Sequence, residues 1–384
     1  MSPRVAIVTA HWGGSLDETT STTRLLAGAL ARSAEVEVVH LASPPEPPAT
    51  VEDSVFRVHR VPWKGARLLR AGLVRTALGT YDGGRHVPAV ASALLEELEG
   101  SAEDAAEVVA GLAPDAVVLA GHHQPWDVSS LGARGGPGAP RVTFVPFLDS
   151  ETALSAAAVA AAERRADVVA VMHTGERRAV LSSFPDRAED SVVPLGCAFA
   201  VNRSASANRL FGVRYFGAYL LSIRCFPPGG PRWERSVTHE VLRSAVGHVS
   251  VAEVDGERWC IGDRENTLEL PVSPSRVNLW RLMRHALATV DLRPPGPVGR
   301  EAIESMLLGT PVVVPDDSAA KQHAADASGG LWYRDVGELT DAVRAIADRR
   351  VRDRLAVQGK AWADRTHGRM DEFVRRARQI VLGD

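Results

Sequence analysis

The stretch GREAIESMLLGTPVVVP, residues 299–315, has the pattern of a helix that runs into a buried strand. Arg300, Glu301 and Glu304 fall in the first two turns of this helix. A helix that packs against a sheet prefers apolar residues there. The start of a helix, however, carries a partial positive charge and outward N–H groups that suit a polar or anionic ligand. The pattern indicates either a ligand-binding helix start or a helix end that is merely capped and solvated.

Two loops of the N-terminal half have residues of similar interest. Gly13 and Gly14 follow the first predicted strand, and His122 and His123 follow a later one. In doubly wound α/β sheets, ligands bind outside the carboxyl ends of the strands, where these residues fall. A glycine pair also suits any strand-to-helix turn, and loop histidines are often only solvated.

Short β-branched segments alternate with segments rich in Ala, Leu and Arg along the whole chain. The predicted strands cover residues 4–10, 35–42, 56–61, 115–121, 141–147, 167–173, 191–199, 218–224, 249–256, 267–272, 288–294, 310–315 and 330–333. The predicted helices cover residues 20–33, 87–100, 154–166, 236–247, 275–286, 299–309, 335–365 and 369–381. Such alternation predicts an α/β protein whose parallel sheets are covered on both faces.

The strand–helix pattern ends near residue 195 and restarts near residue 215. A chain of 384 residues is also too long for one ordinary core, which favours two domains. We therefore expect a doubly wound domain over residues 1–200, a second one over 201–366, and a terminal helical segment over 367–384.

Composition excludes several classes of protein. The net charge of −3 disfavours a nucleic-acid binder, and the three cysteines, Cys197, Cys225 and Cys260, form no CxxC pair that would indicate zinc or disulfides. The segment MSPRVAIVTAHWGG has about five apolar residues in a row, fewer than the roughly 7 to 15 of a signal peptide. No stretch approaches the roughly 18 apolar residues of a membrane span. We expect a cytoplasmic protein.

Four segments together resemble the retaining GT-B glycosyltransferases of the family-4 type: VVPLGCAF, YLLSIRCFPPGG, GREAIESMLLGTPVVVP and GGLWYRDVGELTDAV. The resemblance covers nearly the whole chain, and the VP-x-G turn and the GTPVV run are its most specific parts. It implies two Rossmann-like domains that face a cleft, a nucleotide-sugar donor in the C-terminal domain, and neither metal nor cofactor. It also implies that the last helix returns to the N-terminal domain.

The resemblance assigns roles to several residues. Glu304 matches a carboxylate that hydrogen-bonds the ribose hydroxyls, and Gly299 matches a glycine whose backbone lies against the diphosphate. Arg224 matches an arginine that holds the diphosphate and the charge that develops on the leaving group. An arginine at a strand end is alternatively an ordinary surface ion-pair partner.

Further donor and acceptor contacts come from the loops. Ser318 and Ala319, in PDDSAAKQHA, match the start of a helix that approaches the nucleotide-sugar. The loop with Gly13 and Gly14 matches one near the donor phosphates and acceptor. His122 or His123 would bind an acceptor hydroxyl or the sugar.

Two expected donor contacts are missing. The first carboxylate of the family motif falls at Gly296, and the catalytic lysine falls at Gly229. Candidate substitutes for the lost positive charge are Arg232, our first choice, Arg300 and Arg293, and Glu301 is a candidate for the lost carboxylate.

The resemblance predicts a glycosyltransferase that moves a sugar from a nucleoside-diphosphate sugar to a hydroxyl or amine of a small molecule, natural product or glycan, with retention. The alternatives are an inactive GT-B accessory protein, which the two missing side chains favour, and a nucleotide-sugar 2-epimerase. Residues 62–75 place Lys64, Arg67, Arg70 and Arg75 within about 140° of one helical face. This face suits contact with an anionic membrane, an acceptor, or solvent.

Overall fold

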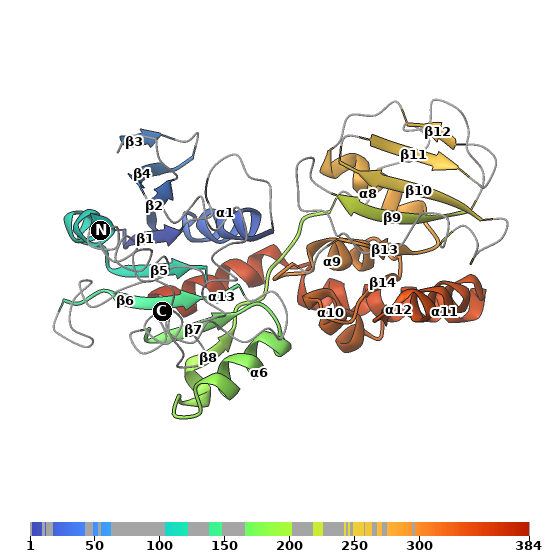
Figure 1. The fold of residues 1–384 in the computed structure, drawn as a ribbon. Coiled ribbons are helices and arrows are strands. Elements are labelled where there is room, and N and C mark those ends of the chain that lie inside the picture. Colours follow the sequence, from blue (N-terminus) through green and yellow to red (C-terminus); the bar gives the residue numbers. More distant parts are fainter. Residues whose placement is uncertain are drawn as a thin grey trace, which may run out of the picture. The chain divides into compact units, whose positions relative to one another are not determined.

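The computed structural model describes residues 2–9, 12, 18–42, 49–52, 55–62, 104–121, 138–147, 166–201, 218–225, 242, 245, 249–256, 258–262, 267–270, 275–293 and 296–383. The chain forms two compact units (Figure 1). The first comprises Met1–Ser15, Thr19–Leu195 and Asp371–Asp384, and the second comprises Leu16–Glu18 and Gly196–Met370. Each unit is built on its own sheet, so the predicted α/β class with two Rossmann-like sheets is confirmed.

The sheet of the first unit has eight strands in the order β3-β4-β2-β1-β5-β6-β7-β8. They are β1 (Arg4–Thr9), β2 (Glu35–Ala42), β3 (Ala49–Glu52), β4 (Arg57–Pro62), β5 (Ala116–Ala120), β6 (Arg141–Val145), β7 (Val168–Val171) and β8 (Val192–Pro194). All neighbours are parallel except β3 and β4. The strand order reverses between β1 and β5, which is the switch point where doubly wound sheets bind ligands.

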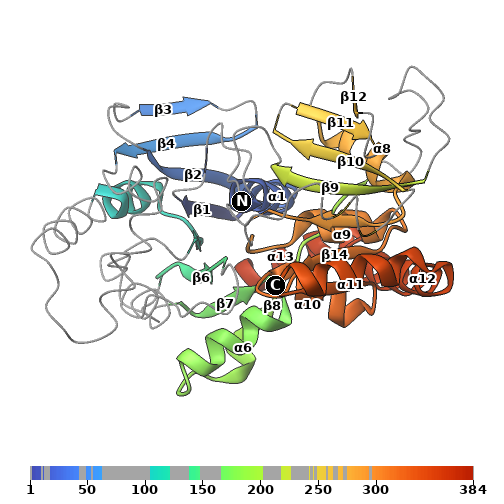
Figure 2. The ribbon, with the colours of Figure 1, turned by 45° about the vertical axis from the view of Figure 1, so that its right-hand side comes forward.

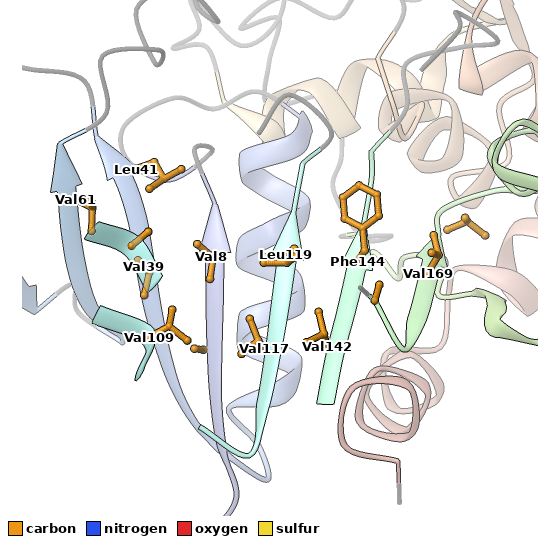
Figure 3. Close-up of a cluster of buried hydrophobic side chains, with 14 of the residues drawn as sticks. Val8, Val39, Leu41, Val61, Val109, Val117, Leu119, Val142, Phe144 and Val169 are labelled. Carbon is orange, nitrogen blue, oxygen red and sulfur yellow. The ribbon is translucent and has the colours of Figure 1, made fainter. Parts of the chain in front are cut away.

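Alternation along these strands produces the core of the first unit. Successive residues of a strand point to opposite faces, so Val8, Val39, Val117 and Phe144 line one face together (Figure 3). The unit also contains α6 (Thr174–Ser183), a 3-10 turn (Glu189–Ser191), α1 (Glu18–Leu30) except for its first residue, and α13 (Met370–Leu382) except for its first residue.

The terminal helix α13 is tied to the first unit by two arginines. Arg376 on the helix donates to the carbonyl of Leu195 at 3.1 Å, and Arg141 on β6 donates to the carbonyl of Ile380 at 3.1 Å.

The sheet of the second unit has seven strands in the order β12-β11-β10-β9-β13-β14-β15. They are β9 (Tyr219–Cys225), β10 (Ser250–Asp255), β11 (Arg258–Gly262), β12 (Thr267–Glu269), β13 (Thr289–Asp291), β14 (Val312–Pro315) and β15 (Gly330–Tyr333). Five neighbouring strands of this sheet are parallel: β10, β9, β13, β14 and β15. The strands β11 and β12 extend the edge beside β10 in antiparallel pairing. Here the switch point lies between β9 and β13.

Both faces of the second sheet are buried. Leu221 and Ile223 of β9 pack with Leu279 and Met283 of α8 (Arg276–His285), whereas the alternate residue Leu220 packs with the apolar residues of α11. The remaining helices of this unit are α9 (Arg300–Leu307), α10 (Ala319–Ala327), α11 (Val336–Ala347) and α12 (Arg349–Thr366). Figure 2 shows α9 to α12 alongside the half of the sheet that contains β14.

The elements differ from the sequence prediction in a few places. The strands β3 and β11 and the helix α6 were not predicted. The predicted helix over 335–365 is two helices, because Asp348 ends α11 and caps α12 by accepting from the N–H of Arg350 at 2.7 Å. Residues 87–100, 154–165 and 63–75 lie outside the described residues, as does most of 236–247. Among the described helices, none is long and apolar enough to cross a membrane.

A buried tyrosine on the edge strand β15 forms a hydrogen bond to the end of β13. The Tyr333 hydroxyl donates to the carbonyl of Asp291 at 2.8 Å. We expect Tyr333→Phe to lower the free energy of unfolding by about 1 to 3 kcal/mol, because a buried carbonyl loses a partner. The matched control is Trp332→Phe, since Trp332 is 41% exposed on the same strand and its change should cost less than about 0.5 kcal/mol in urea denaturation. Equal losses would contradict the assigned role of the hydrogen bond.

Candidate functional site

The site begins where the chain leaves β13 and enters α9, at the switch point of the second sheet. Gly299 is the residue before the helix and has a left-handed backbone, with φ 64° and ψ 40°. A Cβ at this position would lie 2.7 Å from the backbone nitrogen of Ala320 in α10. Glycine is therefore required here for its conformation and for the close approach of α10.

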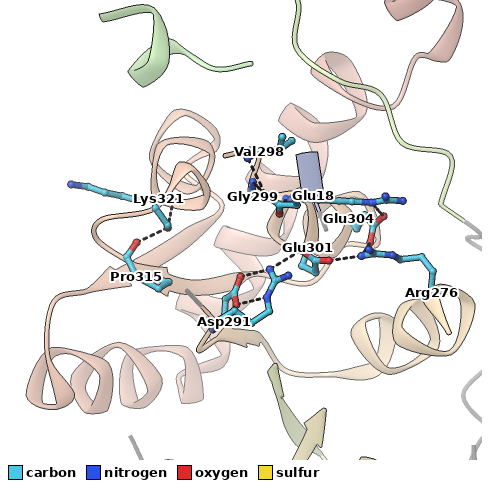
Figure 4. A network of polar contacts seen from close by, with 12 residues as sticks. Glu18, Arg276, Asp291, Val298, Gly299, Glu301, Glu304, Pro315 and Lys321 are labelled. Atoms are coloured by element: carbon cyan, nitrogen blue, oxygen red, sulfur yellow. Dashed lines mark hydrogen bonds and ion pairs between the residues drawn. The ribbon is translucent and has the colours of Figure 1, made fainter. Parts of the chain in front are cut away.

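The first turns of α9 are buried despite their charge. Glu301 and Glu304 are 1% and 0% exposed. Arg276 of α8 reaches both of them: its Nη1 lies 2.5 Å from Oε1 of Glu301 and 3.1 Å from Oε2 of Glu304 (Figure 4). Such burial of carboxylates requires cationic partners, because an unpaired charge in the interior is very costly.

Two more arginines complete the pairing. Arg293 binds both oxygens of Asp291, at 2.9 and 2.7 Å, and its Nη2 lies 2.6 Å from Oε2 of Glu301. Arg300 donates from Nε to Oε1 of Glu304 at 2.8 Å. We call the six residues the ion-pair cluster: Arg276, Asp291, Arg293, Arg300, Glu301 and Glu304. Three guanidinium groups thus balance three carboxylates.

A fourth carboxylate, that of Glu18, lies against the start of α9. Its Oε2 accepts from the N–H groups of Val298 at 2.9 Å and Gly299 at 3.1 Å, and its Oε1 accepts from the N–H of Arg300 at 2.8 Å (Figure 4). Consecutive N–H groups that converge on one anion around a left-handed residue form an anion-binding nest. We call these three N–H groups the α9 nest.

Burial and charge act in opposite directions on the two neighbouring glutamates. Burial, together with the negative charge of Glu301, raises the pKa of Glu18 to about 7. Burial would also raise the pKa of Glu301, but the charges of Arg293 and Arg276 outweigh it and lower the pKa below its ordinary value. Burial also raises the pKa of Cys197 far above its usual range, with Glu18 contributing, so this thiol stays protonated and is a poor nucleophile.

The helix α10 supports the nest from the side. His323 of α10 contacts the carbonyl of Val298 through Nε2 at 2.8 Å. Ser318 caps α10, accepting from the N–H of Lys321 at 3.2 Å, and Ala319 is the first residue of the helix. The predicted start of this helix is confirmed, and the contact of Ala320 with Gly299 brings its first turn next to the nest.

The structure therefore brings Gly299, Arg300, Glu301 and Glu304 together, with Ser318 and Ala319 close by. Arg224 lies near the carboxyl end of β9, where the preceding residue Ile223 is in register with Asp291 of β13. Within the described part of the chain, its ion pair is with Glu253 on β10 at 3.5 Å, not with the ion-pair cluster.

Several predicted site residues lie outside the described residues: Gly13, Gly14, His122, His123, Gly229 and Arg232. Sequence reasoning also missed residues that the structure places in the site, namely Glu18, Arg276 and Asp291. Arg276 follows the N-cap Ser275 of a recognisable helix, but only the packing of α8 against α9 shows its partners. The described residues contain no group of His, Cys, Asp and Glu that would hold a metal ion.

The chain is similar over its whole length to solved structures of glycosyltransferases. No family model and no curated protein sequence matches it. Sucrose-phosphate synthase from Thermosynechococcus elongatus has a TM-score of 0.64 at 16% identity, with 98% of each chain covered. HepE from Anabaena, in complex with UDP and glucose, has a TM-score of 0.59 at 14% identity, with 98% of each chain covered.

A third similar structure is α,α-trehalose 6-phosphate synthase from Burkholderia multivorans, with a TM-score of 0.61 at 14% identity and 99% of each chain covered. At such identities the likeness establishes the fold. The chain has the GT-B fold.

The close approach at Gly299 predicts a large effect of substitution. Gly299→Ala forces an L side chain into a left-handed conformation and also pushes its Cβ into the backbone of α10. The matched control is Gly309→Ala, because Gly309 has φ +84° but its Cβ would meet only Lys360, at 3.6 Å. We expect the control to cost about 1 to 3 kcal/mol of unfolding free energy in urea, from backbone strain alone, and Gly299→Ala to cost clearly more. Equal losses of unfolding free energy in the two variants would contradict the role assigned to the close contact between Gly299 and α10.

The pKa of Glu18 predicts a pH dependence of stability. Its folded value of about 7 lies above the ordinary 4.5, so the folded state binds a proton more strongly than the unfolded state. The resulting stabilisation is fully present below pH 4.5 and is lost as pH rises through 7. Relative to Glu18→Gln, which cannot ionise, the wild type should lose roughly 2 to 4 kcal/mol of unfolding free energy between pH 4.5 and 8. Parallel stability profiles for the two proteins would contradict the raised pKa.

Proposed function

We propose that the chain is a glycosyltransferase that takes its sugar from a nucleoside-diphosphate sugar. One observation carries the proposal: at the switch point of a GT-B sheet, three backbone N–H groups converge on a single carboxyl group, that of Glu18. A phosphate of the donor would bind these N–H groups and benefit from the dipole of α9. HepE, one of the similar structures, was solved with UDP and glucose, which makes UDP-glucose the first donor to test.

Glu304 is our candidate for the ribose contact. Each of its oxygens accepts one hydrogen bond from an arginine, Arg276 or Arg300. A carboxylate oxygen has two lone pairs, so each can accept a second bond from a ribose hydroxyl. The arginines then orient the carboxylate.

The chemistry of transfer requires positive charge near the leaving diphosphate. Without the lysine that the family has at position 229, fixed guanidinium groups are the candidates for this role. Arg224 stands at the carboxyl end of β9, and Arg300 stands at the nest itself. In this proposal transfer is metal-independent and retains the configuration of the sugar, as in the family-4 enzymes that the sequence resembles.

The finer assignments remain predictions from the sequence. They are the family-4 type, the hydroxyl or amine acceptor, the cytoplasmic location and a membrane contact through residues 62–75. The rival function is an inactive GT-B protein. Gly296 favours it, because the residue supplies no carboxylate to the sugar.

Sugar release from UDP-glucose tests the proposal. We expect Arg224→Ala to lower the rate of transfer or hydrolysis by about 100-fold, since one preorganised cation is lost from a developing anion. The matched control is Arg258→Ala, an exposed arginine at the start of β11, which should keep the wild-type rate. If the wild type releases no sugar from UDP-, GDP- or ADP-sugars, the rival reading of an inactive protein is correct. Equal rates of sugar release in the wild type and Arg224→Ala would show that Arg224 has no role in the mechanism.

A further inference from the structure

The α9 nest is already occupied by a group of the protein itself. Glu18 accepts all three N–H groups, at 2.8 to 3.1 Å, and the residue is half-buried there. A phosphate that binds the same three N–H groups has to occupy the space in which the carboxyl group of Glu18 lies, because the oxygens of Glu18 already stand at hydrogen-bond distance from these nitrogens. Occupation by Glu18 and by a phosphate are therefore mutually exclusive.

Gly296 makes the position of Glu18 possible. A Cβ built on Gly296 would overlap the Oε2 atom of Glu18, and the atom it meets is the end of a flexible side chain. The missing side chain at 296 thus has a structural consequence of its own. It leaves the space in which the carboxylate of Glu18 lies.

The charges around Glu18 do not favour its ionised form. Glu301 of α9 repels it, Arg293 after β13 attracts it, and the neutral thiol of Cys197 lies close enough to respond to its charge. The guanidinium of Arg300 is held by Glu304, and that of Arg276 by Glu301 and Glu304. The three guanidinium groups of the ion-pair cluster are thus matched by three carboxylates of the cluster itself.

We propose that Glu18 is an internal competitor for the α9 nest, so that a phosphate binds there only after the carboxylate has been displaced. The inference rests on the proposed function for the identity of the natural ligand, a nucleoside-diphosphate sugar. The competition itself concerns any phosphate group, and inorganic pyrophosphate is a sufficient probe.

Displacement is coupled to the release of a proton. In the nest, Glu18 keeps its proton up to a pH of about 7, whereas a displaced, solvated carboxyl ionises near 4.5. Binding at pH 6 should therefore release about one proton, and affinity should rise as pH increases from 4.5 to 7. Glu18→Gln imitates the protonated occupant at every pH and should remove this dependence.

Calorimetric titration with pyrophosphate at pH 6 tests the competition. We expect Glu18→Ala to bind at least about tenfold more tightly than the wild type, because no hydrogen bonds to the carboxyl have to be broken. Gly296→Ala keeps Glu18 but dislodges it, and should shift affinity in the same direction. The matched control is Glu107→Ala, an exposed helical glutamate, which should bind as the wild type does.

A second series measures the wild type and Glu18→Gln at pH 5, 6, 7 and 8, so that the titration of pyrophosphate itself cancels in the comparison. The proposal predicts a rise in affinity with pH for the wild type relative to Glu18→Gln. Equal or weaker binding by both Glu18→Ala and Gly296→Ala, or parallel pH profiles, would overturn it. If Glu18→Ala binds pyrophosphate more tightly but no donor releases its sugar, the competition by Glu18 is supported and the proposed glycosyltransferase function is contradicted.

Discussion

The second unit depends on burying charge without leaving it unpaired. Glu301 and Glu304 are almost fully buried, which is possible because Arg276, Arg293 and Arg300 come from three different segments to neutralise them. Removing one partner of such a group costs several kcal/mol, since the remaining charge stays buried. The cluster therefore fixes α8, the end of β13 and the start of α9 relative to one another, and the geometry of the nest follows from that.

The same balance explains why Glu18 differs from the other carboxylates. Asp291, Glu301 and Glu304 each have a guanidinium group in contact, while Glu18 accepts from backbone N–H groups and is repelled by Glu301 and attracted by Arg293. In the proposal, a phosphate would use the same three N–H donors that the carboxyl group of Glu18 uses in this structure.

Much of the fold followed from the sequence, because period and turn chemistry are local properties. The strands β2 and β15 have the bounds that were predicted, and α8 and α9 differ by one or two residues at their ends. The strand β11 was missed although Asp255-Gly256 at the end of β10 is a hairpin signal, and Gly256 has the positive φ of such a turn. The break at Asp348 was missed because the segments on both sides of it are helical, and the N-cap that separates α11 from α12 was not recognised.

The sequence by itself determined that α9 opens with a glycine and charged residues, and the resemblance built on it pointed to an anion at that place. Only the tertiary structure decided which charges meet. Arg276 is 25 residues from Glu301 along the chain, and Glu18 is 282 residues from Arg300. Side chains so far apart carry no common period or spacing, so neither pair was predicted. Their contact comes from packing, which also brings the carboxyl group of Glu18 to the backbone N–H groups at the start of α9.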